Sequence, residues 1–297
     1  MRLLITGGSG LLGSKTVSIS LRKGYETYSG YNDHEATNGT PVKLNICNKR
    51  EVDKVFEKVK PDAVIHAAAL TNVDKCEEDQ EMARRVNIEG TQNITEASEH
   101  HNAFLVHIST DYIFSGEEGM YKETDEPDPI NYYGLTKLEA EKIVSSSNLE
   151  WCIARSSVIY GATPAAGKDN FALWVQNKLK NRESMRIITD QWVSPTLNTN
   201  LAEMVLEIIE RKLIGTYHLA GATPINRYDF AVQIAETFQY DNKLISKAKS
   251  SDMNWHAKRP RNTSLNVEKA SNTLDNKPLK IEEALNMLKE EISKVGG

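Results

Sequence analysis

The sequence predicts an α/β fold in which a doubly wound parallel sheet carries a smaller mixed α/β lobe. Three observations lead to this prediction. Short apolar runs alternate with amphipathic stretches over roughly the first half, a glycine-rich turn follows the first apolar run, and the alternation becomes irregular after Gly161. Strand, helix and strand in this order are typical of parallel strands joined by crossover helices that cover both faces of a sheet.

The first lobe is predicted to span residues 1–161. Its expected strands are 2–6, 25–31, 41–45, 62–69, 103–109 and 151–160. Its expected helices are 11–23, 49–59, 81–101 and one that carries Tyr133 and Lys137. The first helix is expected to stop at Gly24, because glycine is common just past a helix C-terminus.

Residues 162–297 are predicted to form the second lobe, with some segments returning to the main sheet. Here the pattern indicates a loop over 163–170, helices 171–181, 200–212 and 227–238, and strands 185–189 and 215–221. A polar stretch over 246–262 and a terminal helix from about residue 281 complete the chain.

Composition argues against several classes of protein. The 36 basic and 41 acidic residues give a net charge of −5 without long single-sign blocks, so neither nucleic acid nor a membrane surface is an expected partner. The N-terminus lacks a signal-peptide core, and a cytoplasmic protein is expected. Cys47, Cys76 and Cys152 are far apart and form no CxxC pair, which argues against disulfides and zinc, and no metal is expected.

A glycine-rich turn lies between the first strand and the first helix. It contains Gly7, Gly10 and Gly13, spaced as in a dinucleotide-binding loop of the Rossmann type. In such a loop the glycines allow a tight turn, close approach of a pyrophosphate and close helix packing, while the helix N-terminus faces the anion. The predicted cofactor-binding residues of this turn are Gly7, Ser9, Gly10, Leu11, Leu12 and Gly13.

The end of the second predicted strand bears on which dinucleotide binds. An acidic residue there usually binds the ribose 2′-hydroxyl of NAD. In "SGYNDH" the first acid, Asp33, comes a few residues late, and no arginine stands nearby. This pattern leaves room for a 2′-phosphate, so NADP(H) is the expected cofactor and NAD(H) the alternative.

The segment "NYYGLTK" holds two adjacent tyrosines before a lysine. On a helix, Tyr133 and Lys137 are four residues apart and face the same side, whereas Tyr132 points elsewhere. A phenol of pKa near 10 becomes a useful acid-base group when an ammonium stabilises its phenolate. The alternative interpretation is an ordinary surface pair on an amphipathic helix.

Polar residues end the strand that precedes this helix. Thr110 and Asp111 follow "AFLVHIS", and ligands of open α/β sheets bind beyond the carboxyl ends of the strands. A hydroxyl there can hydrogen-bond a substrate oxygen, although a turn-capping Thr-Asp pair is the alternative. His66 and His107, inside apolar strands, are interpreted as core or strand-end residues.

Taken together, these motifs resemble the extended short-chain dehydrogenase/reductase family over essentially the whole chain. Within that family, "HAAALTNVDKCEEDQEMARRVN", "HISTDYIFSG", "DQWVSPT" and "RPRNTSLN" are most similar to the dTDP-4-dehydrorhamnose reductases. The resemblance implies NADP(H)-dependent reduction of the C4 keto group of a nucleotide-linked 6-deoxyhexose, most specifically dTDP-4-dehydro-L-rhamnose. It also implies that the first lobe binds the cofactor and the second binds the substrate.

The resemblance assigns roles to individual residues. Tyr133 would donate a proton to the C4 oxygen, Lys137 would lower the pKa of Tyr133 and bind the nicotinamide ribose, and Thr110 would hydrogen-bond the same oxygen. Further implied cofactor contacts are Ala67, Ala68, Ala69 and Asn87. Further implied substrate contacts are Asp111, Tyr112, Val158, Arg259, Arg261 and Asn262, with Arg259, Arg261 and Asn262 as candidate ligands of the diphosphate, where a solvated basic loop is an equal alternative.

Two positions depart from the family pattern. Val158 stands where these reductases often carry a tryptophan, which puts the sugar specificity in doubt. Lys15 stands where some bacterial members carry a glutamate that binds a bridging magnesium, so no such metal-linked dimer is expected. A homodimer of another kind is compatible with the resemblance.

Two other functions are compatible with the same motifs. The regulatory β subunit of methionine adenosyltransferase resembles these reductases, keeps the tyrosine-lysine pair and binds a catalytic subunit without reducing a sugar. A nucleotide-sugar epimerase is the third candidate, and "STDYIF" favours the reductases over it. Oxidation of NADPH by the keto sugar separates the first possibility from the second.

Overall fold

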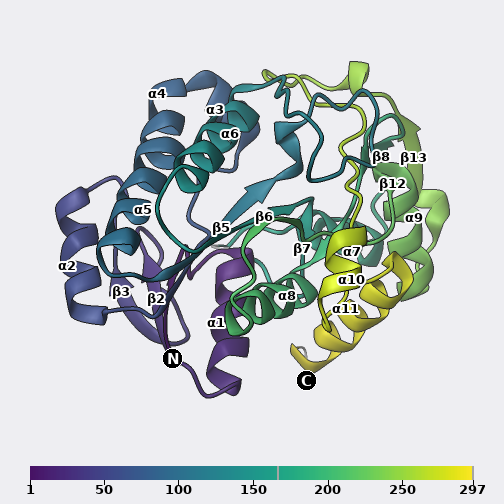
Figure 1. Cartoon of the computed structure of the whole chain (residues 1–297). Helices are drawn as coiled ribbons and strands as arrows, with labels where there is room; N and C mark the ends of the chain where they lie inside the picture. Colours follow the sequence, from purple (N-terminus) through teal and green to yellow (C-terminus); the bar gives the residue numbers. More distant parts are fainter. Residues whose placement is uncertain (166, 296–297) are drawn as a thin grey trace.

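A seven-stranded parallel sheet forms the centre of the computed structural model, which describes residues 1–165 and 167–295 (Figure 1). The strand order is β11-β6-β5-β4-β1-β2-β3, and every neighbouring pair is parallel. The strands are β1 (Arg2–Thr6), β2 (Glu26–Tyr31), β3 (Thr40–Lys43), β4 (Ala63–His66), β5 (Phe104–Thr110), β6 (Trp151–Ser156) and β11 (Gly215–His218). The order reverses direction between β1 and β4, which places a ligand crevice at their carboxyl ends. The predicted doubly wound α/β fold is confirmed.

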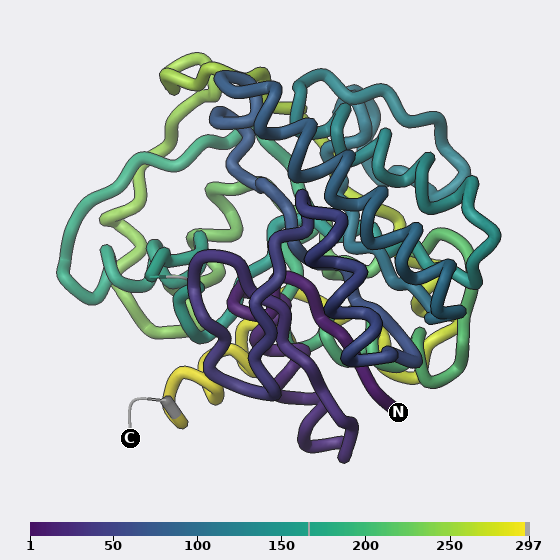
Figure 2. Tube along the Cα trace, turned by 90° about the vertical axis from the view of Figure 1, so that its left-hand side faces the viewer, coloured from purple at the N-terminus to yellow at the C-terminus, as the bar shows by residue number. Residues whose placement is uncertain are grey.

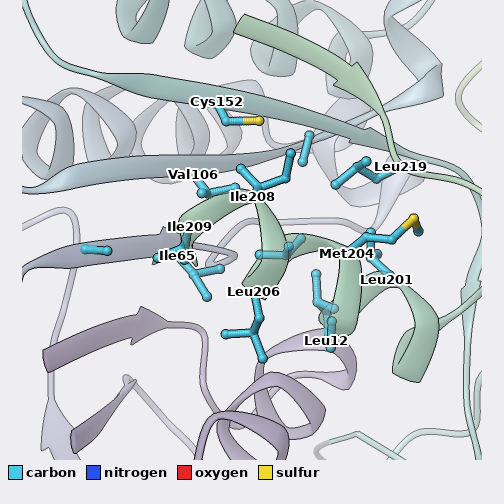
Figure 3. Close-up of a cluster of buried hydrophobic side chains, with 14 of the residues drawn as sticks. Leu12, Ile65, Val106, Cys152, Leu201, Met204, Leu206, Ile208, Ile209 and Leu219 are labelled. Carbon is cyan, nitrogen blue, oxygen red and sulfur yellow. The ribbon is translucent and has the colours of Figure 1, made fainter. Parts of the chain in front are cut away.

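Helices cover both faces of this sheet. One face carries α1 (Leu11–Arg22), α8 (Asn198–Glu210) and α10 (Glu268–Thr273), and the other carries α2 (Lys49–Val59), α5 (Gly90–His100) and α6 (Tyr132–Ser145). Alternation along β1 explains the two layers, since Leu3 and Ile5 belong to the cluster of α1 and α8, while Leu4 belongs to that of α2 and α5. Figure 3 shows the first cluster, with Leu206 of α8 among its buried side chains.

The helix predicted over 81–101 is present, with a change of helix type inside it. It runs without a break from α4 (Gln80–Ala83) through a π-helical turn over Arg84–Glu89 into α5, and the short helix α3 (Val73–Glu78), which was not predicted, precedes it. Two side chains cap the helix starts in this segment: Asn72 Oδ1 accepts from the Lys75 amide at 3.0 Å, and Asp79 Oδ1 accepts from the Met82 amide at 3.0 Å. These N-caps fix where α3 and the 80–100 helical run begin.

The predicted strand over 151–160 is also wrong as one element. It divides into β6 and β7 (Ile159–Tyr160), and β7 pairs with β10 (Thr196–Leu197) outside the main sheet. Val158 lies between them at φ 38°, in the left-handed region that a strand cannot contain. A β-branched residue with this φ is a local outlier, and such outliers concentrate near functional sites.

The second half of the chain has a core of its own and also completes the main sheet. The separate core contains β7, α7 (Phe171–Lys180), β8 (Met185–Ile188), α9 (Arg227–Phe238), β13 (Ile245–Ala248) and α11 (Ile281–Val295). The short strands β9 (Trp192–Val193) and β12 (Ile225–Asn226) pair antiparallel beside it. In contrast, α8 and β11 pack with the first lobe. The boundary at residue 161 stays a prediction, and residues 166, 296 and 297 of the predicted second lobe lie outside the described residues.

Two long-range contacts join the C-terminal part of the chain to the first lobe. The loop over 253–262 crosses beside α3, as Figure 2 shows near the top of the molecule, and Arg259 contacts Asp74 there. Near the C-terminus, Glu291 of α11 accepts from Lys15 of α1 at 2.9 Å. Lys15 stands at the position where some members of the family carry a metal-binding glutamate, and in this chain it links α1 to α11. No described helix is long and apolar enough to cross a membrane.

Leu206 tests whether α8 belongs to the first lobe. Its side chain is fully buried in the cluster with α1 and β1. Leu206→Ala should lower the free energy of unfolding by about 2–5 kcal/mol, because the substitution leaves a cavity in this core. Urea denaturation followed by circular dichroism measures the change. Leu21→Ala, at a 41% exposed position on α1, is the matched control and should cost less than about 1 kcal/mol. Equal losses for the two variants would contradict this packing.

Candidate active site

The glycine-rich turn connects β1 to α1 at the switch point of the sheet. Gly7 has φ +68°, and the Gly10 amide donates to the Gly7 carbonyl at 2.9 Å, which closes the turn. A Cβ at position 13 would lie 2.1 Å from the Gly7 carbonyl oxygen, so only glycine lets α1 approach the turn this closely. Gly10 caps α1 without a side-chain hydrogen bond, which leaves the first amides of the helix to an anion. These features fit the diphosphate of a dinucleotide.

The small residues after β4 lie against this turn. A Cβ on Gly7 would come within 2.8 Å of the Ala68 nitrogen, and the Ala68 amide donates to Thr6 Oγ1 at 3.2 Å. Asn87 supports the same segment: its Oδ1 accepts from the Leu70 amide at 2.8 Å, and its Nδ2 donates to Thr136 Oγ1 at 3.0 Å. Because Thr136 lies on α6, Asn87 links the alanine segment (residues 67–69) to the helix that carries the candidate catalytic residues.

The remaining predicted cofactor residues of the turn, Ser9, Leu11 and Leu12, differ in how far they are buried. Leu12 is 5% exposed and packs into the core with α8, so its side chain does not face a cofactor (Figure 3). The carbonyl of Leu11 accepts from Asn198 Nδ2 at 3.0 Å. Ser9 is half-buried in the turn. Leu12 can therefore contribute only backbone groups, whereas the partly exposed side chain of Leu11 stays available to a cofactor.

Two local contacts position Tyr133 at the start of α6. Asn131 caps the helix, since its Oδ1 accepts from the Gly134 amide at 2.9 Å. A Cβ on Gly134 would lie 2.1 Å from the Tyr112 carbonyl oxygen, so the helix packs directly on the short 3₁₀ turn Asp111–Ile113. The Tyr112 and Tyr133 rings meet edge to face with 6.0 Å between their centroids.

The environment of Tyr133 keeps its phenol protonated. Burial raises the pKa of Tyr133 above its ordinary value of 10.0, and a hydrogen bond with Thr110 acts in the opposite direction. The resemblance implied a pKa lowered by Lys137, and the structure shows a raised one. A protonated phenol beside Thr110 can donate a proton to a carbonyl oxygen.

Lys137 lies one turn further along α6 and is 3% exposed. Its Nζ donates to the Ile108 carbonyl at 2.8 Å and is 3.1 Å from Nε2 of His107. Burial lowers the pKa of Lys137 from 10.5 to about 8, while Glu141 acts to raise it. Burial and the charge of Lys137 also hold the pKa of His107 well below its usual value, so His107 is neutral and its Nε2 can accept from the ammonium.

His107 was interpreted as a core residue, and its contact with Lys137 was missed. It is fully buried on β5, as expected, but it orients the candidate catalytic lysine. Residues 107 and 137 are 30 positions apart, and the contact depends on how α6 packs on β5, which no local pattern reveals.

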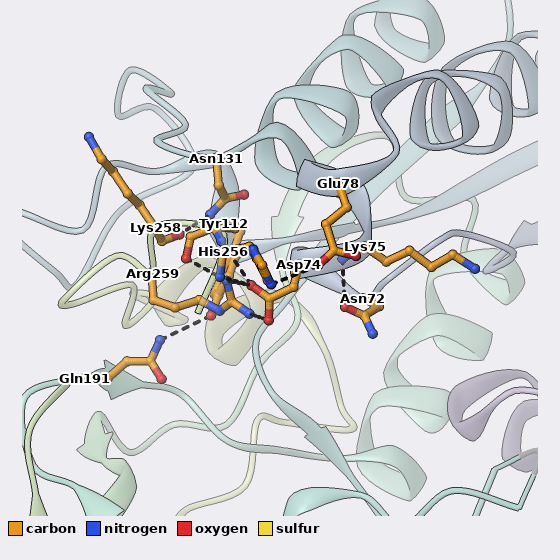
Figure 4. Close-up of polar contacts among 11 residues, drawn as sticks. Asn72, Asp74, Lys75, Glu78, Tyr112, Asn131, Gln191, His256, Lys258 and Arg259 are labelled. Atoms are coloured by element: carbon orange, nitrogen blue, oxygen red, sulfur yellow. Dashed lines mark hydrogen bonds and ion pairs between the residues drawn. The ribbon is translucent and has the colours of Figure 1, made fainter. Parts of the chain in front are cut away.

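Asp111 has a more enclosed position than the resemblance implied. Its carboxylate is 2% exposed and accepts hydrogen bonds from Thr110 at 3.0 Å, Ser157 at 2.8 Å and Thr263 at 2.5 Å. Burial raises its pKa, and the three hydroxyls oppose this effect. Asp111 therefore joins three segments and orients Thr110. Tyr112, the next residue, accepts from Gln191 Nε2 at 3.2 Å through its hydroxyl (Figure 4).

Arg259 forms an ion pair with Asp74 of α3, as Figure 4 shows. Its two terminal nitrogens donate to the two carboxylate oxygens at 3.0 and 2.8 Å. Burial acts to raise the pKa of Asp74, but hydrogen bonds led by that from Arg259 hold it below the ordinary value. The guanidinium carbon of Arg259 also lies over the Trp255 ring, 5.1 Å from the centroid of that ring. The charge of Arg259 is thus largely neutralised within the protein.

The other predicted substrate residues of this loop differ from one another. Asn262 Oδ1 accepts from the amide of Ser264 at 3.2 Å and from its hydroxyl at 2.8 Å, which gives Asn262 a structural role. Arg261 is exposed, and its carbonyl accepts from the Trp192 amide at 2.7 Å. Val158 is half-buried at the break between β6 and β7. Among the described residues, no group of three or more His, Cys, Asp and Glu side chains could hold a metal ion.

Comparison with known proteins extends this picture. A family model described as "RmlD substrate binding domain" matches residues 1–293. The chain is 32% identical to a probable low-salt glycan biosynthesis reductase of Haloferax volcanii, covering 92% of both chains. It is 31% identical to a dTDP-4-dehydrorhamnose reductase of Aggregatibacter actinomycetemcomitans, covering 96% of this chain and 97% of the relative.

A solved structure and one further relative bear on the competing functions. The dTDP-4-dehydrorhamnose reductase of Bacillus anthracis in complex with NADP superposes with a TM-score of 0.88 at 28% identity, covering 98% of this chain and 99% of the other. The bovine methionine adenosyltransferase 2 subunit beta is 28% identical, covering 90% of this chain and 81% of that protein.

The buried ammonium of Lys137 predicts a pH dependence of stability. The unfolded chain holds this proton up to about pH 10.5, whereas the folded protein releases it near pH 8. Between these values the unfolded state binds more protons, so the free energy of unfolding should rise with pH relative to a Lys137→Met variant. The difference across the window should approach about 3 kcal/mol.

Urea denaturation of both proteins at several pH values between 7 and 10.5 measures this effect. Because every other titrating group is shared, the difference between the two curves reports position 137. Parallel curves would show that burial leaves the lysine pKa unchanged.

Proposed function

The chain belongs to the RmlD substrate binding domain family, and we propose that it reduces the C4 keto group of dTDP-4-dehydro-L-rhamnose to give dTDP-L-rhamnose. It is an oxidoreductase of the sugar-nucleotide type that uses NADP(H). One observation carries the proposed reduction: Tyr133, Thr110 and the glycine-rich turn lie at the carboxyl ends of β1, β4 and β5. The reductase relatives match over nearly the whole chain, which supports the same assignment.

The chain's own residues account for the proton of this reaction. Bound NADPH would supply a hydride to C4 of the sugar. Tyr133 gives its phenol proton to the C4 oxygen, so the carbonyl becomes a hydroxyl and solvent later restores the proton on the tyrosine. Thr110 lies beside Tyr133, and its hydroxyl can donate to the same oxygen once it turns away from Asp111 Oδ1, to which it donates at 3.0 Å in this structure. Lys137 would then favour the transient phenolate, because its ammonium has a third proton beyond those given to Ile108 and His107.

Lys43 supports the preference for a phosphorylated cofactor, and sequence reasoning missed it. It lies at the carboxyl end of β3, directly opposite Tyr31 of β2 in the parallel register. Its Nζ hydrogen-bonds the Asn32 carbonyl and lies 5.6 Å from the centroid of the Tyr31 ring. We infer that this cation binds the 2′-phosphate at the edge where NAD-dependent proteins carry an acid. No arginine is needed for that role.

The regulatory function stays a second candidate because the bovine methionine adenosyltransferase 2 subunit beta matches 90% of this chain. The match to that relative is compatible with a binding function for this chain, in which Tyr133 and Lys137 are present but reduce no sugar. A homodimer and a cytoplasmic location also stay predictions.

Tyr133→Phe tests the proposed reduction. The variant should lose about 10²- to 10⁴-fold in kcat with NADPH and dTDP-4-dehydro-L-rhamnose, because phenylalanine has no proton to donate. Absorbance of NADPH measures turnover, and quenching of protein fluorescence by NADPH shows that the cofactor still binds.

Tyr132→Phe is the matched control, since it removes the same hydroxyl from the neighbouring residue. It should keep nearly full activity. A wild-type protein that oxidises NADPH no faster than Tyr133→Phe would refute the reductase assignment, and binding to methionine adenosyltransferase would then be the decisive assay.

Lys43→Met tests the cofactor preference. Loss of one charge-assisted contact to the 2′-phosphate should weaken NADPH about tenfold and leave NADH nearly unchanged. Fluorescence titration of each dinucleotide gives the two dissociation constants. Lys54→Met, at an exposed lysine of α2, controls for the general loss of positive charge. Equal weakening of NADPH and NADH would rule out Lys43 as the 2′-phosphate ligand.

A further inference from the structure

Arg227 occupies an unusual position for a cation of the second lobe. It is the first residue of α9 and is half-buried between segments that meet near Tyr112. Its Nε donates to Gln191 Oε1 at 3.0 Å, and its backbone amide donates to the Gln191 carbonyl at 3.1 Å. The Phe171 ring of α7 lies 5.2 Å from the guanidinium carbon. These contacts, together with a hydrogen bond to Tyr112, hold the guanidinium in place.

The charge of Arg227 is not balanced by an ion pair. Within residues 1–165 and 167–295, no carboxylate oxygen lies within 4.0 Å of a nitrogen of this side chain. Asp111 is near enough to attract it electrostatically, but the carboxylate of Asp111 is hydrogen-bonded to Thr110, Ser157 and Thr263. Burial lowers the pKa of Arg227, and Arg259 also acts to lower it. A partly buried cation without a carboxylate partner is a favourable place for an anion.

Gln191 connects this cation to the candidate catalytic residues. It is 4% exposed, and its amide bridges two groups: Oε1 accepts from Arg227, while Nε2 donates to the Tyr112 hydroxyl at 3.2 Å. Tyr112 in turn packs edge to face on Tyr133. Figure 4 shows Gln191 and Tyr112 on the side of the site where Arg259 pairs with Asp74. Arg227 thus contacts Tyr112 both directly and through Gln191, and Tyr112 packs on the proposed proton donor.

We propose that Arg227, oriented by Gln191, binds the diphosphate of the nucleotide-linked sugar and fixes the distance between that diphosphate and Tyr133. This inference rests on the proposed function for the identity of the anion. It changes the assignment made from the sequence, in which Arg259 was a candidate ligand of the diphosphate. Arg259 gives both terminal nitrogens to Asp74 and keeps the 253–262 loop against α3, whereas the terminal nitrogens of Arg227 form no ion pair in the described chain. A guanidinium held through Nε presents those two nitrogens as a fork that matches phosphate oxygens.

Binding of dTDP by the full-length protein tests the proposal directly. Isothermal titration calorimetry with wild type and Arg227→Met should show a roughly 10- to 100-fold loss of dTDP affinity, because charge-assisted hydrogen bonds to a phosphate are lost. Arg227→Lys should recover only part of the loss, since an ammonium cannot form the same fork. Arg182→Met is the matched control, because it removes an exposed arginine of the same lobe and should leave dTDP affinity unchanged.

A second variant keeps the arginine but cancels its charge. Gln191→Glu would place a carboxylate on Nε of Arg227 with almost no change in side-chain size. It should weaken dTDP by a similar factor, and a merely structural role for Arg227 does not predict this result. In steady-state assays both variants should raise KM for the nucleotide sugar more than they lower kcat.

NADPH titration separates the two possible sources of the phosphate. Both variants should bind NADPH within about twofold of wild type, which would also show that they are folded. Equal weakening of NADPH would assign the anion to the cofactor and overturn the proposal. Unchanged binding of dTDP by Arg227→Met would also overturn the proposal. So would a wild-type protein that binds neither dTDP nor UDP, a nucleoside diphosphate with a different base.

Failure of the proposed function gives a different pattern from failure of this inference. A wild type that binds dTDP through Arg227 but does not oxidise NADPH with the keto sugar would refute the reductase assignment and leave the anion site in place. A wild-type protein that reduces the sugar, together with an Arg227→Met variant that binds dTDP normally, would support the reductase assignment and refute the anion site at Arg227.

Discussion

Close backbone approach at three glycines is the constraint on which the site depends. A Cβ at Gly7 would collide with Ala68, one at Gly13 with the Gly7 carbonyl, and one at Gly134 with the Tyr112 carbonyl. These contacts bring β1, α1, the alanine segment, α6 and the turn after β5 within hydrogen-bonding distance of one another. Asn87 then links the alanine segment to α6 through Leu70 and Thr136. Helix α6 and the glycine-rich turn are therefore packed into one unit, and a side chain at any of the three glycines would force its neighbours apart.

Charge is distributed unevenly around this unit. Lys137 is enclosed with neutral acceptors, the Ile108 carbonyl and His107, and burial lowers the pKa of its ammonium to about 8. Asp111 is enclosed by three hydroxyls and Arg259 by Asp74, so neither is available to a charged ligand. The charges left without a partner in the site are those that the reaction can use. This distinction between enclosed and available charge favours Arg227 over Arg259 as the proposed substrate ligand.

The sequence predicted the sheet, the glycine turn and the tyrosine-lysine helix because each depends on local spacing. Strand and helix periods are visible in single segments, and Tyr133 and Lys137 lie one helical turn apart. The short helix α3 was not predicted because its cap, Asn72, lies before the apolar pattern begins, and the π-helical turn over Arg84–Glu89 has no side-chain cap that could signal it. His107, Gln191 and Arg227 had no local signal at all. Their partners are 30, 79 and 36 positions away, so only the packed structure brings them together.

The same reasoning explains why motifs alone do not separate the reductase from a regulatory relative. In the proposed roles, Gly7, Tyr133 and Lys137 would serve the dinucleotide as well as the reaction, so a protein that only binds a dinucleotide has reason to keep them. A catalytic protein must also hold a second, anionic substrate at a fixed distance from the phenol, and that requirement falls on the second lobe. In this chain it falls on Arg227 and Gln191, which have no evident part in holding a dinucleotide at the opposite lobe. Residues of this kind therefore report on sugar reduction more specifically than the tyrosine-lysine pair does.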